Sequence, residues 1–188
     1  MMDMFIRSEL ILGGQKSGKT RRAEHIAQRW MQAASTHRTC YLATGQAWDE
    51  EMHTRICRHQ NDRAARVPGM VTVEAPLLLA QALQFHSNPD TLLVVDCLTM
   101  WLTNWMMPAP IATEPIHNWE TQRTSFLQTL PLCQGPVVIV GNEIGLGVIP
   151  LGREVRTFVD ALGVLNQDVA HICQRVTLMA AGLPLQLK

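Results

Sequence analysis

The fold is decided by the stretch Gly13-Gly14-Gln15-Lys16-Ser17-Gly18-Lys19-Thr20. It matches the phosphate-binding P-loop pattern Gly-x-x-x-x-Gly-Lys-Ser/Thr, follows the apolar run 10–12 and precedes the helix-forming segment 21–31. Glycines permit the turn, successive backbone N–H groups point at a phosphate, and the helix N-terminus adds partial positive charge. A Gly-rich turn without a ligand is the alternative, but the flanking strand and helix favour a protein that binds a nucleoside triphosphate.

An acidic residue at the end of a second apolar run complements this motif. The run Leu92-Leu93-Val94-Val95 is typical of a fully buried parallel strand, and Asp96 follows it directly. By analogy with P-loop enzymes, Lys19 would neutralise the β- and γ-phosphate oxygens and the Thr20 hydroxyl would ligate Mg²⁺. Asp96 would then hold Mg²⁺ through water or polarise the nucleophile. The alternative for Asp96 is a helix N-cap before Cys97.

Strand and helix patterns alternate along the whole chain. Together they predict an α/β fold with a mainly parallel sheet flanked by helices, a RecA-like P-loop NTPase in a single domain over residues 1–188. Residues 61–70 are expected to form a polar connection, and residues 182–184 to begin a short tail. The expected strands cover 5–12, 39–43, 71–74, 92–96, 137–140 and 175–180, and the expected helices 18–33, 49–60, 77–85, 98–105, 117–130 and 153–173, the last as one or two helices.

Polar residues follow two further predicted strands. Thr44-Gly45-Gln46 comes after the strand at 39–43, and Asn142 with Glu143 follows the strand at 137–140. Because ligands collect at the carboxyl ends of strands in open α/β sheets, both groups are candidates for nucleotide or phosphate contact. Ordinary turns are the alternative at both places.

One histidine lies on the patterned face of a predicted helix. Met52, Ile56 and His59 follow one another at four and three residues, which places them on a common face. The pattern alone favours a packed or solvated histidine, because a single histidine on a helix is weak support for catalysis.

Composition restricts the class of partner. The 16 basic and 16 acidic residues cancel and no Lys/Arg run appears, which argues against nucleic acid as a main partner. No apolar stretch is long enough for a membrane span and no secretory signal is recognisable, so a cytoplasmic protein is expected. The five cysteines lack metal-binding spacing and are expected to be reduced and mostly buried. Residues 106–115, which are rich in proline, are the expected mobile or subunit-contacting loop.

In combination, these motifs resemble one enzyme family, the bifunctional adenosylcobinamide kinase / adenosylcobinamide-phosphate guanylyltransferases of cobalamin biosynthesis. The resemblance covers nearly the whole chain, and the blocks beyond the P-loop make it specific. They are Tyr41-Leu42-Ala43-Thr44, the helix segment Asp49-x-Glu51-Met52-x-x-Arg55-Ile56-x-x-His59, Asp96-Cys97-Leu98-Thr99 with Thr103-Asn104, Asn142-Glu143-Ile144-Gly145-x-Gly147-x-Ile149-Pro150, and Arg156-x-Phe158-x-Asp160-x-x-Gly163-x-x-Asn166-Gln167.

The resemblance implies two reactions on one scaffold. ATP or GTP would phosphorylate the aminopropanol hydroxyl of adenosylcobinamide, and GTP would then give GMP to a histidine, which passes it to adenosylcobinamide phosphate. The family's guanylylated histidine falls on His59. The resemblance also implies Mg²⁺, a propeller-like homotrimer, and GTP contacts from Thr44, Gly45, Gln46, Gln60, Asn61, Asp62 and Arg63, with Glu74 and Asp96 in or near the site.

The chain departs from its relatives around this histidine. Many relatives have two adjacent histidines where this chain has Arg58-His59, and His53 is the nearest rival nucleophile. A position in the last turn of the helix would favour the protonated ring, so a neighbour such as Arg55 or Arg58 would have to hold His59 neutral. Relatives that kept one activity, or a P-loop ATPase acting as a nucleotide-dependent switch, are the alternative functions.

Overall fold

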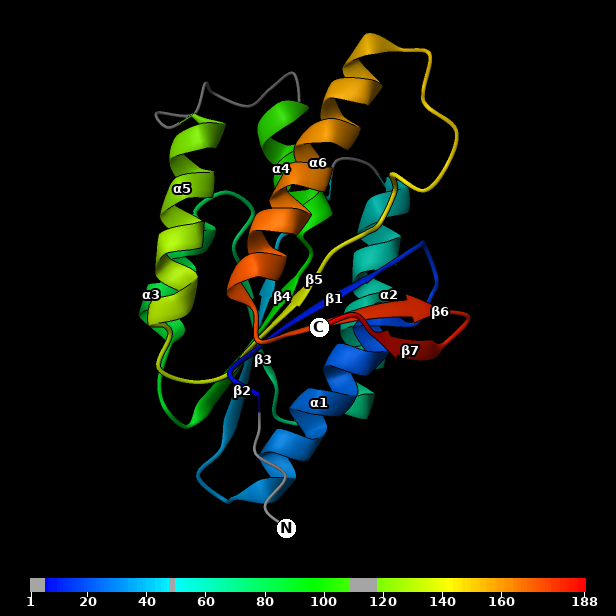
Figure 1. Cartoon of the computed structure of the whole chain (residues 1–188). Coiled ribbons are helices and arrows are strands. Elements are labelled where there is room, and N and C mark those ends of the chain that lie inside the picture. Colours follow the sequence, from blue (N-terminus) through cyan, green and yellow to red (C-terminus); the bar gives the residue numbers. More distant parts are fainter. Residues whose placement is uncertain (1–5, 48–49, 109–117) are drawn as a thin grey trace.

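A computed structural model of the protein describes residues 6–47, 50–108 and 118–188, with a seven-stranded sheet at its centre (Figure 1). The strand order is β3-β2-β4-β5-β1-β6-β7, with β7 antiparallel to β6 and all other neighbours parallel. The strands are β1 Ser8–Gly13, β2 Arg38–Ala43, β3 Val71–Glu74, β4 Thr91–Asp96, β5 Val137–Val140, β6 Arg175–Ala180 and β7 Leu183–Gln186.

Helices cover both faces of this sheet. Two of them, α1 and α2, pack on one face, and α3 to α6 pack on the other (Figure 1). The helices are α1 Lys19–Ala33, α2 Glu50–Arg66, α3 Leu79–His86, α4 Leu98–Met106, α5 Trp119–Thr129, the 3₁₀ turn η1 Leu130–Leu132 and α6 Arg153–Ile172. None of the helices in the described ranges is long and apolar enough to span a bilayer. This architecture confirms the predicted α/β fold.

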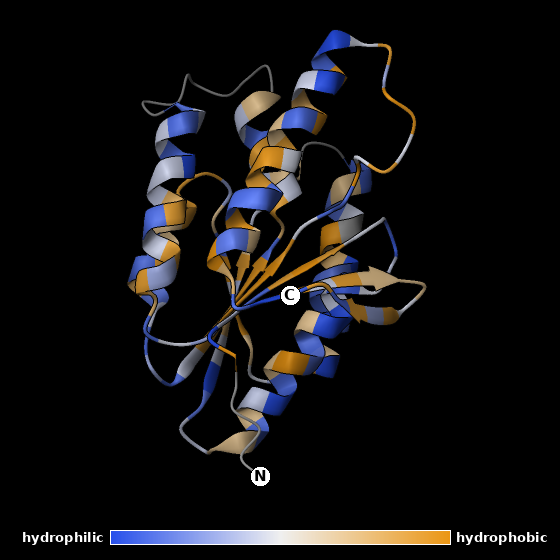
Figure 2. Cartoon of the chain, viewed as in Figure 1, coloured by the Kyte–Doolittle hydropathy of each residue, from blue (hydrophilic) through white to orange (hydrophobic). Residues whose placement is uncertain are grey.

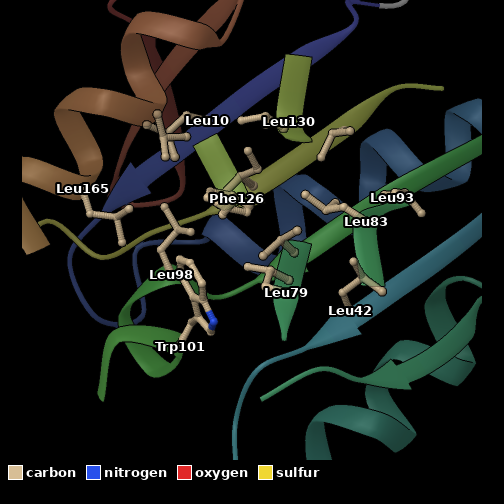
Figure 3. Packing of buried hydrophobic residues seen from close by; sticks show 14 of the residues in the cluster. Leu10, Leu42, Leu79, Leu83, Leu93, Leu98, Trp101, Phe126, Leu130 and Leu165 are labelled. Carbon is tan, nitrogen blue, oxygen red and sulfur yellow. The ribbon is translucent and has the colours of Figure 1, made fainter. Parts of the chain in front are cut away.

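The central strands are apolar on both faces, and Figure 2 accordingly colours them as hydrophobic. Side chains alternate between two cores. Leu10 and Leu12 of β1 face the core under α3 to α6, whereas Ile11 faces the core under α1. The larger core is built around Trp101 and Phe126, whose ring centroids lie 5.1 Å apart, with Leu79 and Leu98 nearby (Figure 3).

Two expected boundaries were wrong. Helix α2 continues to Arg66 instead of ending near Gln60, because Ala64 and Ala65 are strong helix formers and the chain turns only at Pro68-Gly69. The expected tail forms strand β7, in which Pro184 is tolerated because the strand lies at the sheet edge. Residues 153–172 form one helix. Of the expected mobile loop 106–115, residues 109–115 lie outside the described residues.

The topology gathers the candidate residues at one edge of the sheet. Strand β5 lies between β1 and β4, and α1 leaves the P-loop and crosses over these strands to reach β2. The carboxyl ends of β1, β5, β4 and β2 therefore meet, carrying the P-loop, Glu143, Asp96 and Thr44 respectively. This is the edge at which open α/β sheets bind ligands.

Candidate active site

The P-loop needs its glycines for space as well as for turning. Gly13 has φ of 150°, and a Cβ there would lie 2.5 Å from the Met179 carbonyl oxygen and 2.6 Å from Ser17 Oγ. Gly18 has φ of 101° and lies against Gly182, whose N–H donates to the Ser17 carbonyl at 3.0 Å. The turn between β6 and β7 thus supports the loop from behind, while Gly14, Gln15 and Lys16 remain exposed on its outer side.

Lys19 is held inside the loop that it serves. Its side chain is only 8% exposed, and Nζ donates to the Gly14 carbonyl at 2.6 Å. Burial lowers the pKa of Lys19, and the nearby Cys97 and Asp96 oppose that shift. A phosphate bound in the loop offers Nζ an anionic acceptor in place of a neutral carbonyl, which makes Lys19 a charge donor already aimed at the site.

Asp96 accepts two hydrogen bonds on one oxygen. Thr20 Oγ1 donates to Oδ2 at 2.9 Å, and the Tyr41 hydroxyl donates to the same atom at 2.7 Å. A threonine hydroxyl and a carboxylate beside a phosphate loop are the hard oxygen ligands that Mg²⁺ takes, together with phosphate and water. The residues present therefore fit Mg²⁺. Asp96 does not serve as a side-chain cap for α4, whose first residue is Leu98.

Thr44 joins the ends of β2 and β4. Its hydroxyl accepts from the Cys97 N–H at 2.7 Å and donates to the Cys97 carbonyl at 2.7 Å, and the residue is fully buried. Asn104 clamps the same turn by donating from Nδ2 to the carbonyls of Thr44 and Pro76. The Thr44 side chain is thus engaged within the protein, and Gly45 and Gln46 are half-buried at the sheet edge.

His59 lies in the middle of α2 and not in its last turn, because the helix runs for seven residues beyond it. The expected conflict with the helix dipole therefore disappears, since that effect is confined to the terminal turn. The His59 side chain is exposed. Among the neighbours expected to contact GTP, Gln60 and Asn61 are exposed, and Asp62 pairs with Arg66 at 3.4 Å. Glu74 is exposed at the end of β3.

Arg63 behaves differently from the other polar residues of α2. It is 4% exposed, its guanidinium carbon lies 3.7 Å from the centroid of the Tyr41 ring, and Nη2 donates to Thr72 Oγ1 at 3.1 Å. Seven residues earlier, Ile56 Cδ1 lies 4.0 Å from the position of a Cβ at Gly45. His59 falls between these two contacts along the helix, so it lies level with the ends of β2 and β4.

The tip of β5 touches the P-loop directly. The Glu143 N–H donates to the Gly13 carbonyl at 3.1 Å, and Glu143 Oε1 accepts from the Gly145 N–H at 2.8 Å. The neighbouring Asn142 is fixed through its backbone, because its N–H donates to Thr99 Oγ1 and its carbonyl accepts from Asn166 Nδ2. Glu143 is the half-buried carboxylate that this arrangement brings next to the loop.

A groove of about 550 Å³ opens between the loop after β5 and α6. On the loop side of the groove, apolar side chains are exposed to solvent, and Val148 is 96% exposed. Figure 2 shows this loop extending away from the sheet. Arg156 fixes the loop by donating to the carbonyls of Pro150 and Leu151. Groove-lining residues include Ile144, Val148, Ile149, Arg156, Asp160 and Gln167.

Four of the five cysteines are buried, as expected, and Cys57 on α2 is half-exposed. Burial raises the pKa of Cys97 and of Cys173 to about 12, which keeps both as thiols. Among residues 6–47, 50–108 and 118–188 there is no group of three His, Cys, Asp or Glu side chains placed to hold a metal. The candidate metal site consequently depends on Thr20 and Asp96 with a bound nucleotide.

Comparison with known proteins identifies the family. The model of a family described as cobinamide kinase / cobinamide phosphate guanyltransferase matches residues 9–187. The chain is 43% identical over 180 residues to the bifunctional adenosylcobalamin biosynthesis protein CobP of Pseudomonas aeruginosa, covering 96% of each chain. It is 30% identical to the corresponding CobU of Escherichia coli, covering 95% of this chain and 98% of that one.

A solved structure supports the fold at much lower sequence identity. The flagellar accessory protein FlaH of Methanocaldococcus jannaschii aligns with a TM-score of 0.53 and 12% identity, covering 97% of this chain and 78% of that one.

Proposed function

The chain belongs to the cobinamide kinase / cobinamide phosphate guanyltransferase family, and we propose that both reactions of the family take place at the sheet edge that holds the P-loop. The observation that carries this proposal is that phosphate- and metal-binding residues, a carboxylate and a histidine lie at one edge of the sheet. Lys19 and the Thr20–Asp96 pair are arranged for a triphosphate with its metal, Glu143 lies beside the loop, and His59 lies level with the strand ends.

In the kinase reaction, the γ-phosphoryl group of ATP or GTP passes to the aminopropanol hydroxyl of adenosylcobinamide. The acceptor oxygen forms a bond to the γ-phosphorus, and the bond to the β–γ bridging oxygen breaks. The backbone N–H groups of residues 13–18 bind the phosphates and Lys19 balances their charge. Thr20 and Asp96 would hold Mg²⁺, which offsets the negative charge on the phosphate oxygens.

Glu143 is the better placed of two candidate bases for the acceptor hydroxyl. Asp96 Oδ2 already accepts from Thr20 and Tyr41, whereas Glu143 carries one short bond from the backbone of Gly145 and lies beside Gly13. A Glu143→Ala variant that folds normally should lose most phosphoryl transfer while still forming the GMP adduct. An unchanged phosphorylation rate would remove Glu143 from the mechanism.

In the transferase reaction, a ring nitrogen of His59 attacks the α-phosphorus of GTP and pyrophosphate leaves. A neutral imidazole carries a lone pair on one ring nitrogen, which makes it a suitable nucleophile. A phosphate oxygen of adenosylcobinamide phosphate then attacks the phosphorus of the GMP adduct. The nitrogen–phosphorus bond breaks, and adenosylcobinamide-GDP is released. GTP contacts from Thr44 to Gln46, from Gln60 to Asp62 and from Glu74 remain part of the proposal.

The decisive experiment follows the label of GTP. The protein is incubated with Mg²⁺ and GTP labelled in turn at the α- and γ-phosphate, and then separated by denaturing electrophoresis beside His59→Ala and His53→Ala. Label retained from the α position alone, labile in acid and absent only from His59→Ala, is the expected result. His53→Ala is the matched control, since this histidine lies on the same helix and is also exposed.

Other results would change the assignment. Wild-type protein that retains no label would indicate a relative with kinase activity alone or a nucleotide-dependent switch. Label that persists in His59→Ala but disappears from His53→Ala would identify His53 as the nucleophile.

We also propose a homotrimer, as the family resemblance implies. Two apolar surfaces support an assembly: the loop over residues 144–151 and the outer edge strand β7, where Leu183 and Leu185 are exposed. Analytical ultracentrifugation of the wild-type protein tests the stoichiometry, and a monomer at micromolar concentration would contradict it.

A further inference from the structure

We propose that Arg63 is a positioning residue for guanylyl transfer, because its guanidinium, stacked on Tyr41, fixes helix α2 so that His59 lies level with Asp96. This inference rests on the proposed function, since it concerns how the guanylylated histidine is placed. It also replaces the expected role of Arg63 as a direct GTP contact.

The burial of Arg63 requires compensation. A guanidinium removed from water loses solvation, and here the Tyr41 ring at 3.7 Å and the Thr72 hydroxyl at 3.1 Å provide the compensating contacts. Tyr41 belongs to β2 and Thr72 to β3, so the contacts join α2 to two neighbouring strands. At the last residue of the helix, Arg66 forms an ion pair with Glu24 of α1 at 2.9 Å.

Tyr41 continues this link to the metal-binding carboxylate. Its ring lies under Arg63, and its hydroxyl donates to the same Asp96 oxygen that accepts from Thr20. Burial, reinforced by the charge of Asp96, raises the pKa of Tyr41 well above its usual value, so the phenol keeps the proton that it donates. Contacts therefore run without interruption from α2 through β2 to β4 and α1.

The spacing along α2 connects the position of Arg63 to that of His59. His59 precedes Arg63 by four residues, which is about 6 Å of helix rise on nearly the same side. Strand β2 ends at Ala43, opposite Asp96, and α2 starts beyond that end and runs back along the sheet. Fixing Arg63 at Tyr41 thus sets His59 near the strand ends, where the triphosphate binds, and a loosened helix would move it.

The first test measures single-turnover formation of the GMP adduct and phosphorylation of adenosylcobinamide in the same preparations. Arg63→Met keeps the length and apolar character of the side chain but loses the cation. We expect adduct formation at saturating GTP to fall about 10- to 100-fold, with the KM for GTP and phosphoryl transfer within about threefold of wild type. Arg63→Lys retains a cation and should recover part of the loss.

Thr72→Val is the matched control. It removes the hydrogen bond between the Arg63 guanidinium and Thr72 Oγ1, and it leaves the stack on Tyr41 in place. Its adduct formation should stay within roughly twofold of wild type. A loss as large as that of Arg63→Met would overturn the assignment to the stack.

A second readout does not depend on activity, because Tyr41 is the one tyrosine in the sequence. Protein labelled with ¹³C at tyrosine Cζ gives a single resonance. We expect this resonance to shift on addition of Mg²⁺ and GTP, and to shift already in free Arg63→Met. An unchanged resonance in free Arg63→Met would overturn the proposal.

The remaining outcomes separate this proposal from the proposed function. A higher KM for GTP with an unchanged rate at saturation would make Arg63 a nucleotide contact and overturn the positioning role. An equal loss of both reactions, or a lower stability with normal rates, would also overturn it. If wild-type protein forms no adduct, the proposed function itself fails, whereas a normal adduct in Arg63→Met removes only the role of Arg63.

Discussion

The two halves of the site are held in different ways. Around the P-loop, Lys19, Thr20, Asp96 and Thr44 are tied by short hydrogen bonds to strands in the middle of the sheet. Helix α2, which carries His59, covers the end of the sheet near the edge strand β3, and most of its polar side chains are exposed. The phosphate site is thus built before the nucleotide arrives, while His59, the proposed nucleophile, lies on a helix held mainly by Arg63, Arg66 and apolar contacts.

This difference fits the chemistry of each half. Phosphoryl transfer depends on donors that are fixed in advance around the phosphates, and it involves no covalent bond to the protein. Guanylyl transfer requires one side chain to receive a group from one substrate and to pass it to another. An exposed residue on a peripheral helix is accessible to both.

Thiol labelling should give the largest contrast between the two regions. Cys57 of α2 is half-exposed, whereas Cys40, Cys97, Cys133 and Cys173 are buried. Because buried thiols react only after the structure opens, Cys57 should react roughly 10³-fold faster or more with a neutral disulfide reagent in native protein. Mass spectrometry after timed quenching identifies the site, and Cys57→Ser should lose the fast phase. Fast labelling of Cys97 instead would contradict a preformed P-loop edge.

Loss of Lys19 should affect catalysis almost as strongly. In Lys19→Ala, the charge that meets the β- and γ-phosphates is gone, so phosphoryl transfer should fall about 10²- to 10³-fold. Initial rates with adenosylcobinamide measure the effect. Lys188→Ala is the control, because Nζ of this lysine donates to the carbonyls of Ala170 and His171 at the C-terminal end of α6. A loss below tenfold in Lys19→Ala would mean that the loop amides alone carry the charge.

Thr44 tests how far the P-loop edge depends on its internal bonds. Thr44→Val leaves the buried N–H and carbonyl of Cys97 without the hydroxyl, and the free energy of unfolding should fall by about 2–3 kcal/mol. Urea denaturation measures the change, and Thr44→Ser should recover most of it. If Thr44→Val keeps wild-type stability but weakens GTP binding, the side chain binds the nucleotide and does not stabilise the contact between the ends of β2 and β4.

The buried thiols should also make the protein less stable in alkali. Burial raises the pKa of Cys173 from 9.0 to about 12, so the folded state retains a proton that the unfolded state loses. The stabilising contribution is complete below pH 9 and is lost as the pH rises toward 12. Replacing Cys173 by serine should reduce the loss of stability between pH 8 and pH 10 by about 1 kcal/mol. An unchanged pH dependence in the serine variant would contradict the effect of burial on this thiol.

The sequence predicted the P-loop side of the site better than the α2 side. The motif at residues 13–20 and the apolar run ending at Asp96 are local patterns. The Thr20–Asp96 hydrogen bond joins the two segments that these patterns identify. The length of α2 was underestimated because residues 61–66 read as polar. Their helix is stabilised by the burial of Arg63 against Tyr41, a contact between residues 22 positions apart that no local pattern contains.

Other functional contacts could not be predicted for the same reason. Tyr41 appeared only as a strand residue and as part of a family block, although it is the one tyrosine in the chain and lies two residues before the end of β2. Asn104 and Asn166 clamp the turns at Thr44 and Asn142 from helices α4 and α6. Their side chains find these carbonyls through the packing of helices on the sheet, and spacing along the chain does not reveal it.

The supporting turn behind the P-loop has a consequence for folding. Strand β1 pairs with β5 and β6, and the Ser17 carbonyl receives its hydrogen bond from Gly182, so the P-loop is held by residues that lie far away in the sequence. Glu9 similarly waits for Thr177, whose hydroxyl donates to it. Closure of the P-loop therefore depends on non-local contacts, which form late because the intervening chain must first be ordered.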